Sequence, residues 1–410
     1  MTVNTFSRMG TANAYDSTIA NLQRRQNTLS NLQESLSSGK KVNTPSDDPT
    51  GAAQAERALN RLARIATDQR ALENQRNAIA SAESTLGSIT DALQQARELM
   101  VSAGNGSFTA ADRKTVTDQL TGLRQRILSL ANAQDSNGQP LFAALGSALT
   151  PFAGPVSTTP DYTFNGLPGT AAGDTYNLAS TLDGDSAFML QPGRDGAYNV
   201  RTSTASGSLA SGAVTVNTPA AVTGSSYSLT VTGFAAGTVT YDLTETTAAG
   251  VSTTTPGLSA SWTANTGFAV NGMAGLSLTV TGTPAVGDSV TVDPNSSVFS
   301  TLDKAVTDIS GAGSGKAASQ AVNQAIHNLD ISMARISAVR GQAGDLLNRA
   351  DSITSTNQKR TIEQKGNQSR AEDLDMVQAI SDFQNQQTGY QAALQSYAQI
   401  QKLSLFNYVG

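Results

Sequence analysis

Two adjacent carboxylates, Asp47 and Asp48, lie between two prolines in the stretch GKKVNTPSDDPTGAA, residues 39–53. Paired aspartates could bind a metal ion or act as a general acid and base. No histidine or third carboxylate is spaced to join them, and the neighbouring residues favour a structural role. Asp48 is placed to cap a helix that starts with Pro49, and Asp47 adds negative charge at its positive end. The predicted helix end, turn and cap comprise Gly39, Pro45, Asp47, Asp48 and Pro49.

Other residues with chemical potential are too few or wrongly spaced for catalysis. His327 is the single histidine, and cysteine is absent, which excludes thiolate sites and leaves no partners for a zinc site or most Ser-His-Asp arrangements. Asp183 and Asp185 lack the spacing of a twelve-residue calcium loop and favour a turn. We therefore expect no enzyme, no catalytic, cofactor-binding or metal-binding residue, and no cofactor.

The stretch SGAGSGKAAS, residues 310–319, resembles a phosphate-binding loop in its glycines and lysine. The phosphate-binding motif, however, requires glycine where Ser310 stands and serine or threonine where Ala317 stands. The motif also comes directly after a strand, and no strand is predicted immediately before residue 310. We interpret the stretch as a linker into the next helix.

Composition and charge restrict the class of protein further. The 410 residues are 38% hydrophobic but only 5% aromatic, which indicates an elongated molecule rather than a compact enzyme. Residues 141–300 contain two arginines against nine acids, and neither this part nor the rest has a basic stripe for nucleic acid. Because we find no signal-peptide pattern and no apolar run of about 18 residues, we expect neither Sec export nor membrane insertion.

Both ends of the chain keep a seven-residue hydrophobic period. Ile65, Leu72, Ile79, Leu86, Leu93 and Met100 form one unbroken seam with Ala82, Ile89 and Ala96 as a second row, and Val322, Ile326, Leu329, Met333 and Ile336 form another. Such seams predict long helices that need helical partners. For these inner helices, we expect an antiparallel bundle within the chain.

The outermost segments, residues 6–38 and 370–405, have seams interrupted by glutamines, which suits an interface that stays soluble before assembly. We expect these seams to contact other copies of the chain. The predicted intersubunit residues are Tyr15, Leu22, Leu29, Leu36, Met376, Ile380, Phe383, Tyr390, Leu394 and Tyr397.

The middle of the chain has a different texture, rich in threonine, serine, glycine and valine. Period-two alternation marks strands in residues 226–233, 237–246 and 275–294. The predicted fold class is therefore mainly α with a β insertion. Its long heptad-patterned helices come from both termini and form a bundle or coiled coil. The predicted parts are residues 1–43 with 365–410 as outer helices, 44–145 with 301–364 as an inner bundle with a hairpin, and 146–300 as an inserted Thr/Gly-rich β domain, in one or two pieces.

The stretch NLQESLSSGKKVNTPSDDPTGAA resembles the N-terminal signature of bacterial flagellins and of the flagellar hook–filament junction proteins. The form PSDDP and the ending EDLDMVQAISDFQNQQTGYQAALQSYAQIQKLSLFNYVG are closer to the junction proteins than to flagellin. LTPF, LDGDSAF and TGTPAVGDSVTV in the middle are also similar to the insertion of the junction proteins.

This resemblance implies a structural adapter at the outer end of the bacterial flagellar hook. It implies a homo-oligomeric ring between the first hook–filament junction protein and the flagellin filament, and export by the flagellar type III system without a Sec signal. It also implies a cytoplasmic export chaperone that covers the C-terminal helix. The alternative is flagellin, the subunit of the filament itself.

Overall fold

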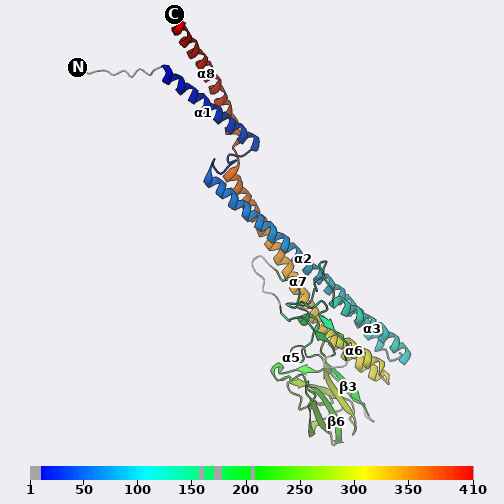
Figure 1. Cartoon of the computed structure of the whole chain (residues 1–410). Helices are drawn as coiled ribbons and strands as arrows, with labels where there is room; N and C mark the ends of the chain where they lie inside the picture. Colours follow the sequence, from blue (N-terminus) through cyan, green and yellow to red (C-terminus); the bar gives the residue numbers. More distant parts are fainter. Residues whose placement is uncertain (1–10, 157–160, 170–177, 205–207, 410) are drawn as a thin grey trace, which may run out of the picture. The chain divides into compact units, whose positions relative to one another are not determined.

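Long helices form both ends of the chain, and shorter strands and helices lie between them in the sequence (Figure 1). The structure is a computed structural model that describes residues 11–156, 161–169, 178–204 and 208–409, and within these ranges it describes side chains from 16 to 399. The helices are α1 (Thr11–Ser38), α2 (Pro49–Ala103), α3 (Ala110–Ala131), α4 (Gly184–Phe188), α5 (Pro192–Asp195), α6 (Val298–Ser310), α7 (Gly315–Glu372) and α8 (Met376–Val409). The chain divides into two compact units, unit 1 with residues 1–69 and 354–410, and unit 2 with residues 70–353.

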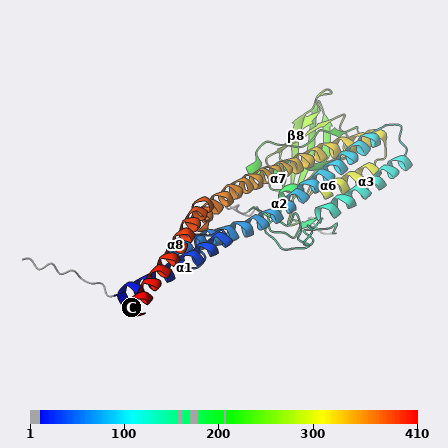
Figure 2. The ribbon, with the colours of Figure 1, turned by 90° about the horizontal axis from the view of Figure 1, so that it is seen from above.

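The helices of unit 2 form a bundle around one hydrophobic core (Figure 2). Ion pairs join Arg76 to Asp351, Glu83 to Arg340 and Arg97 to Asp330. Because the residue numbers rise along α2 and fall along α7, the two helices run antiparallel. Helix α3 begins with a capping box. The Thr109 side chain accepts the backbone N–H of Asp112, and the Asp112 side chain accepts the backbone N–H of Thr109.

Most residues of the predicted inner seams lie in this core. Ile326 and Met333 pack partly buried against it, and Ile65 is half-buried in unit 1. In unit 2, Leu72, Ile79, Leu86, Leu93 and Met100 of α2 are at most 1% exposed, and Val322, Leu329 and Ile336 of α7 are buried opposite them. Full burial of each large aliphatic side chain stabilises the folded state by about 1.5–3 kcal/mol relative to leaving it exposed. The prediction that the inner helices form an antiparallel bundle within the chain is thus confirmed for unit 2.

The first part of the middle segment shares the core of the bundle. The ring of Phe299 lies 5.2–6.0 Å from those of Phe152, Tyr162 and Phe188, measured between centroids, and all four side chains are buried in the core of the bundle. Tyr162 Oη also donates a hydrogen bond of 2.5 Å to Asp303, which in turn pairs with Arg124 of α3 at 2.8 Å. The short strands β1 (Phe152–Ala153) and β2 (Thr163–Phe164) pair within this layer.

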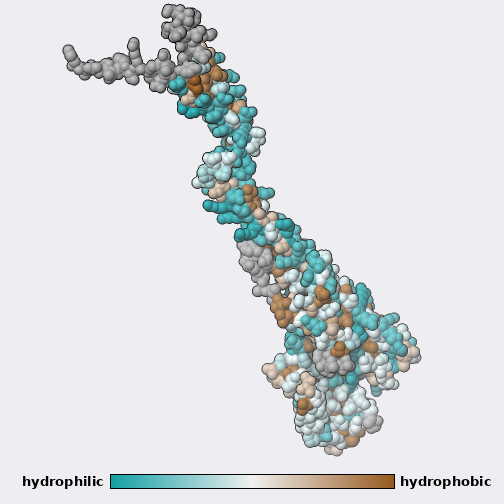
Figure 3. Space-filling view, in the orientation of Figure 1, coloured by the Kyte–Doolittle hydropathy of each residue, from teal (hydrophilic) through white to brown (hydrophobic). Residues whose placement is uncertain are grey.

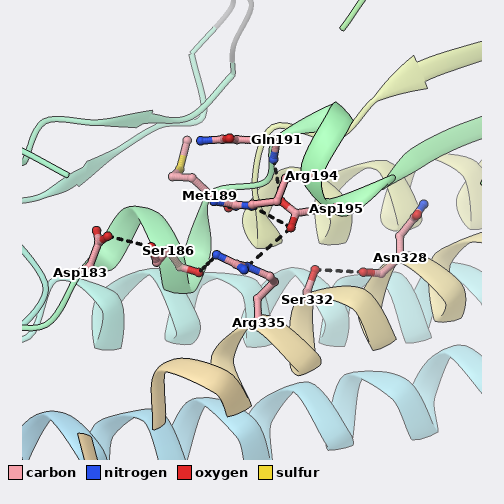
Figure 4. Close-up of polar contacts among 9 residues, drawn as sticks. All are labelled: Asp183, Ser186, Met189, Gln191, Arg194, Asp195, Asn328, Ser332 and Arg335. Carbon is pink, nitrogen blue, oxygen red and sulfur yellow. Dashed lines mark hydrogen bonds and ion pairs between the residues drawn. The ribbon is translucent and has the colours of Figure 1, made fainter. Parts of the chain in front are cut away.

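Side chains of α7 hold the segment that leads into the sheet (Figure 4). Arg335 donates to the Ser186 carbonyl at 2.8 Å and lies 3.6 Å from the buried carboxylate of Asp195, which Arg194 also contacts at 2.8 Å. Asn328 donates to the carbonyl of Tyr198 at 2.8 Å. Asp183 accepts from Asp185 N and Ser186 Oγ, so it caps α4. The segment around Asp183 is thus a helix start packed on α7.

The remaining strands enclose a second, separate core. A five-stranded antiparallel sheet has the order β3-β12-β6-β7-β8, and small sheets pair β4, β9 and β11, and β5 with β10. The core contains Tyr198, Tyr227, Tyr241, Phe268 and Val290, among others. The elements are β3 (Tyr198–Ser203), β4 (Ala210–Ser211), β5 (Thr215–Val216), the 3-10 turn η1 (Pro219–Ala221), β6 (Ser226–Ala235), β7 (Thr238–Thr246), β8 (Ser252–Ser261), β9 (Phe268–Ala269), β10 (Leu276–Ser277), β11 (Thr279–Thr281) and β12 (Ser289–Pro294).

We call residues 198–294 the β module. Its two ends meet, because Asn295 N donates to the Ala197 carbonyl at 2.9 Å. The predicted strands in residues 226–233, 237–246 and 275–294 are confirmed, and so is the predicted fold class of long helices with a β insertion. The predicted division into three parts stays a prediction. In the part of the chain that the structure describes, no helix is both long and apolar enough to cross a membrane.

Candidate assembly surface

Helices α1 and α8 pack side by side within unit 1 (Figure 1). Arg25 Nη1 donates to Gln386 Oε1 at 3.4 Å across this contact. A Cβ on Gly389 would lie 2.6 Å from Arg25 Nη1, so the glycine gives the arginine room to cross α8. The heptad pattern required a helical partner for each segment but did not predict that the two would pair within one chain.

This pairing leaves the predicted seam incompletely covered. Leu22, Leu29, Leu36, Phe383, Tyr390 and Tyr397 are half-buried. Met376, Ile380 and Leu394 are 45%, 45% and 42% exposed. The side chain of Tyr15 lies outside the described residues. Among the described side chains of α1 and α8, 16–38 and 376–399, Ala379 is the one apolar residue that is fully buried.

Hydrophobic side chains therefore reach the surface of the α1–α8 pair (Figure 3). Val377, which the sequence analysis did not single out, is 82% exposed next to Met376. We define the outer-pair surface as Met376, Val377, Ile380 and Leu394. Apolar side chains that line one helix without cover favour contact with another protein surface. Whether the seam makes intersubunit contacts stays a prediction.

A short backbone ladder ties the loop after α1 to the break between α7 and α8. Lys41 N donates to the Glu372 carbonyl at 2.8 Å, and Leu374 N donates to the Gly39 carbonyl at 3.0 Å. Lys40 Nζ lies 3.3 Å from the Glu372 carboxylate. We call this pairing of residues 39–41 with 372–374 the clasp. The clasp joins segments that are more than 300 residues apart in the sequence. It therefore holds the interruption between α1 and α2 against the interruption between α7 and α8.

The adjacent aspartates Asp47 and Asp48 organise the turn beside the clasp. Asp47 accepts from the backbone N–H of Asn43 at 3.1 Å and of Thr44 at 2.8 Å, which closes the turn that contains Pro45. Asp48 accepts from Thr50 N at 3.0 Å, and its own carbonyl accepts the N–H of Ala52 at 2.9 Å. These are the hydrogen bonds of an N-cap before Pro49, the first residue of α2.

These hydrogen bonds favour the ionised carboxylates. The Thr44 N–H lowers the pKa of Asp47, and the Gly51 N–H lowers the pKa of Asp48, each below the ordinary value of 3.8. Because the folded pKa values are lowered, their contribution to stability is present above the ordinary carboxyl pKa and is lost as pH falls through the lowered values. Their capping bonds thus hold at neutral pH.

Sequence reasoning missed the residues on the far side of the clasp. Asp375 Oδ1 accepts from the backbone N–H of Val377 at 3.1 Å and of Gln378 at 3.2 Å, which caps α8. An aspartate directly before Met376 is an N-cap signal that could have located this helix boundary. The pairing of Lys41 with Glu372 had no comparable local signal.

Gly39 offers a direct test of the clasp. Its φ of +70° lies in the left-handed region, and an added Cβ would meet no atom within 4 Å, so only the backbone penalty opposes a side chain. We expect Gly39→Ala to destabilise unit 1 by about 1–2 kcal/mol. Hydrogen exchange at Lys41 and Leu374 should speed up. The matched control is Gly366→Ala in α7, where the nearest atom would be 3.7 Å away and a helical alanine should stabilise. Equal exchange in both variants would contradict the strain assigned to Gly39.

Among the described residues, no group of three or more acidic, histidine or cysteine side chains gathers that could hold a metal. The polar groups of unit 1 instead cap helices and join segments. The outer-pair surface is the feature of this unit that another protein could contact.

Residues 10–146 match the family model described as the bacterial flagellin N-terminal helical region. The N-terminal part of this chain is thus similar to the helical region of bacterial flagellins. Flagellar hook-associated protein 3 of Salmonella typhimurium is 35% identical over 154 residues, which cover 35% of this chain and 46% of that protein. Phase 1 flagellin of Salmonella naestved is 31% identical over 118 residues, which cover 29% of this chain and 23% of that flagellin. The alignments thus span less than half the length of these relatives.

The crystal structure of the flagellar junction protein FlgL from Legionella pneumophila superposes with a TM-score of 0.58 at 25% identity. The match covers 73% of this chain and 99% of that one. These matches confirm the resemblance to the hook–filament junction proteins that the sequence predicted. The relatives are structural proteins of the flagellum rather than enzymes.

Proposed function

We propose that this chain is a structural adapter of the bacterial flagellum that joins the hook to the flagellin filament. The observation that carries the proposal is the outer-pair surface on the α1–α8 pair, whose helix α1 lies within the region that matches the flagellin family model. Such a surface suits lateral contact between copies, and the closer relative in identity and coverage is a hook-associated protein rather than a flagellin. In this role the protein acts through contacts alone and carries no catalytic residue, cofactor or metal.

The partners follow from the two faces that an adapter must present. Copies of the chain form a ring through the predicted seam of α1 and α8, with the first hook–filament junction protein on one side and flagellin on the other. Before assembly, an export chaperone covers α8, where Val377 and its neighbours would otherwise expose apolar surface. The ring lies outside the cell, and the subunits reach it by the flagellar type III route without a Sec signal.

Flagellin is the second candidate, supported by the flagellin family model and by the match to phase 1 flagellin. The two functions differ in how far assembly proceeds. A filament subunit adds to itself without limit, whereas a junction protein stops at a ring and is needed in few copies.

Complementation separates these functions. We expect the chain to restore filaments in a strain that lacks its own hook-associated protein 3 but keeps flagellin, scored as filaments per hook by electron microscopy. In a strain that lacks flagellin, it should produce none, because a ring does not propagate. Filaments built from this chain alone would favour flagellin, and secreted flagellin without attached filaments in the first strain would contradict the adapter role.

A further inference from the structure

One edge of the five-stranded sheet in the β module is strand β8, which carries no charged side chain. β8 (Ser252–Ser261) pairs only with β7 in the five-stranded sheet, and residues 252–257 are all exposed. Between Glu245 and Asp288 the sequence contains no charged residue. An exposed, uncharged strand of threonine and serine is a template for pairing with another strand, because its outer N–H and C=O groups are not paired with a neighbouring strand. The Ser259 carbonyl accepts one long hydrogen bond of 3.4 Å from the side chain of Asn271.

The opposite edge of the sheet is protected in a different way. β3 carries Arg201, which lies 2.7 Å from Asp308 of α6 and 3.8 Å from Asp293. Asn199 donates to the same Asp308 at 2.7 Å. Helix α6 and this ion-pair network occupy the β3 side, so an incoming strand would have to displace charges there. β8 lacks both devices.

A bulge interrupts β8 at its centre instead. Thr255 pairs with Leu243 and Leu258 pairs with Tyr241, so Pro256 and Gly257 together face the single residue Asp242. Pro256 has no N–H to donate. The N–H of Gly257 is turned to the Asp242 carboxylate at 2.9 Å, and its φ of +71° is in the left-handed region. The bulge therefore removes two adjacent donors and kinks the strand between its two paired halves.

We propose that the Pro256–Gly257 bulge, tied down by Asp242, prevents β8 from pairing with β8 of a second copy of this chain. The repelled occupant is a second copy because an antiparallel β8–β8 contact is self-complementary about a two-fold axis and needs no other partner. Each half of the interrupted edge has only four residues, Ser252–Thr255 and Leu258–Ser261, which is shorter than a typical strand of five to six. The device matters in a chain that is proposed to assemble through its helices, because sheet pairing between modules would compete with that order.

The test is to straighten the strand in the full chain. A variant with Pro256→Thr and Gly257 deleted restores one-to-one pairing with β7, and Pro256→Thr alone returns one N–H to the edge. We expect the first variant at least to double its weight-average molar mass by light scattering at concentrations where the natural chain does not, and the second to associate more weakly. Adding Ser259→Lys to the straightened variant should reverse the association, because a lysine on the edge would be desolvated by pairing.

Two outcomes would overturn the proposal. One is that both variants keep the oligomeric state of the natural chain while circular dichroism shows intact strands and helices. The other is association that Ser259→Lys leaves unchanged, because the contact would then lie elsewhere on the molecule. The single substitution keeps the test valid even where the deletion impairs folding of the β module.

Discussion

Excision of the β module, residues 198–294, with Ala197 joined to Asn295 through two glycines, should leave a helical chain that still melts cooperatively. The two residues are already joined by a hydrogen bond of 2.9 Å, so the linker spans little distance. The sheet has its own core, and its loss removes no member of the bundle core. Asn328, which loses its acceptor on Tyr198, becomes accessible to water rather than being left buried and unpaired.

Removal of residues 146–300 should instead abolish the cooperative melt of unit 2. This longer deletion takes away Phe152, Tyr162, Phe188 and Phe299, which are at most 3% exposed in the bundle core. Truncation of a single buried aromatic side chain costs about 3–5 kcal/mol, so losing four costs about 12–20 kcal/mol, which matches or exceeds the 5–15 kcal/mol that typically stabilises a domain. Circular dichroism at 222 nm during thermal unfolding distinguishes the two deletions. Equal cooperative melts in both would show that the aromatic cluster is dispensable to the bundle.

A charge in the predicted outer seam should block assembly without affecting unit 2. In Leu29→Asp and Leu394→Asp, each carboxylate would be desolvated when copies of the chain meet, at a cost of several kcal/mol. Leu394 is 42% exposed and Leu29 half-buried in unit 1, so unfolding of unit 2 should change by no more than about 0.5 kcal/mol. In the complementation strain we expect hooks without filaments and flagellin secreted into the medium.

Two kinds of control define this result. Asn31→Asp and Gln395→Asp place the same charge on exposed positions of α1 and α8 and should keep filaments at the natural frequency. Ala82→Asp puts a charge at a site that is 1% exposed in the bundle core, and it should lower the melting temperature of the isolated chain. Filaments at natural frequency in the Leu29 and Leu394 variants, or destabilisation matching that of Ala82→Asp, would show that these seams are not intersubunit contacts.

Features set by neighbouring residues could be predicted from the sequence alone. The seven-residue spacing from Leu72 to Met100 places one side chain of each heptad on the same face of a helix, so it predicted both the helix and its buried side. Asp48 and Pro49 start α2 through hydrogen bonds within four residues. The strands around Tyr227 and Tyr241 followed from their alternation, which is equally local.

Only the tertiary structure decided how these elements pair. A heptad seam such as that of Leu22 and Leu29 requires an apolar partner but does not specify which one, and in the structure α1 pairs with α8 of the same chain. The hydrogen bond between Lys41 and Glu372 in the clasp joins backbone groups, which every residue has. No side-chain pattern in the sequence therefore predicts it. Phe188 and Phe268 are the same residue type, yet one is buried in the helical core and the other in the sheet core. That assignment depends on which surfaces long-range folding brings together, because burial of apolar area has no direction of its own.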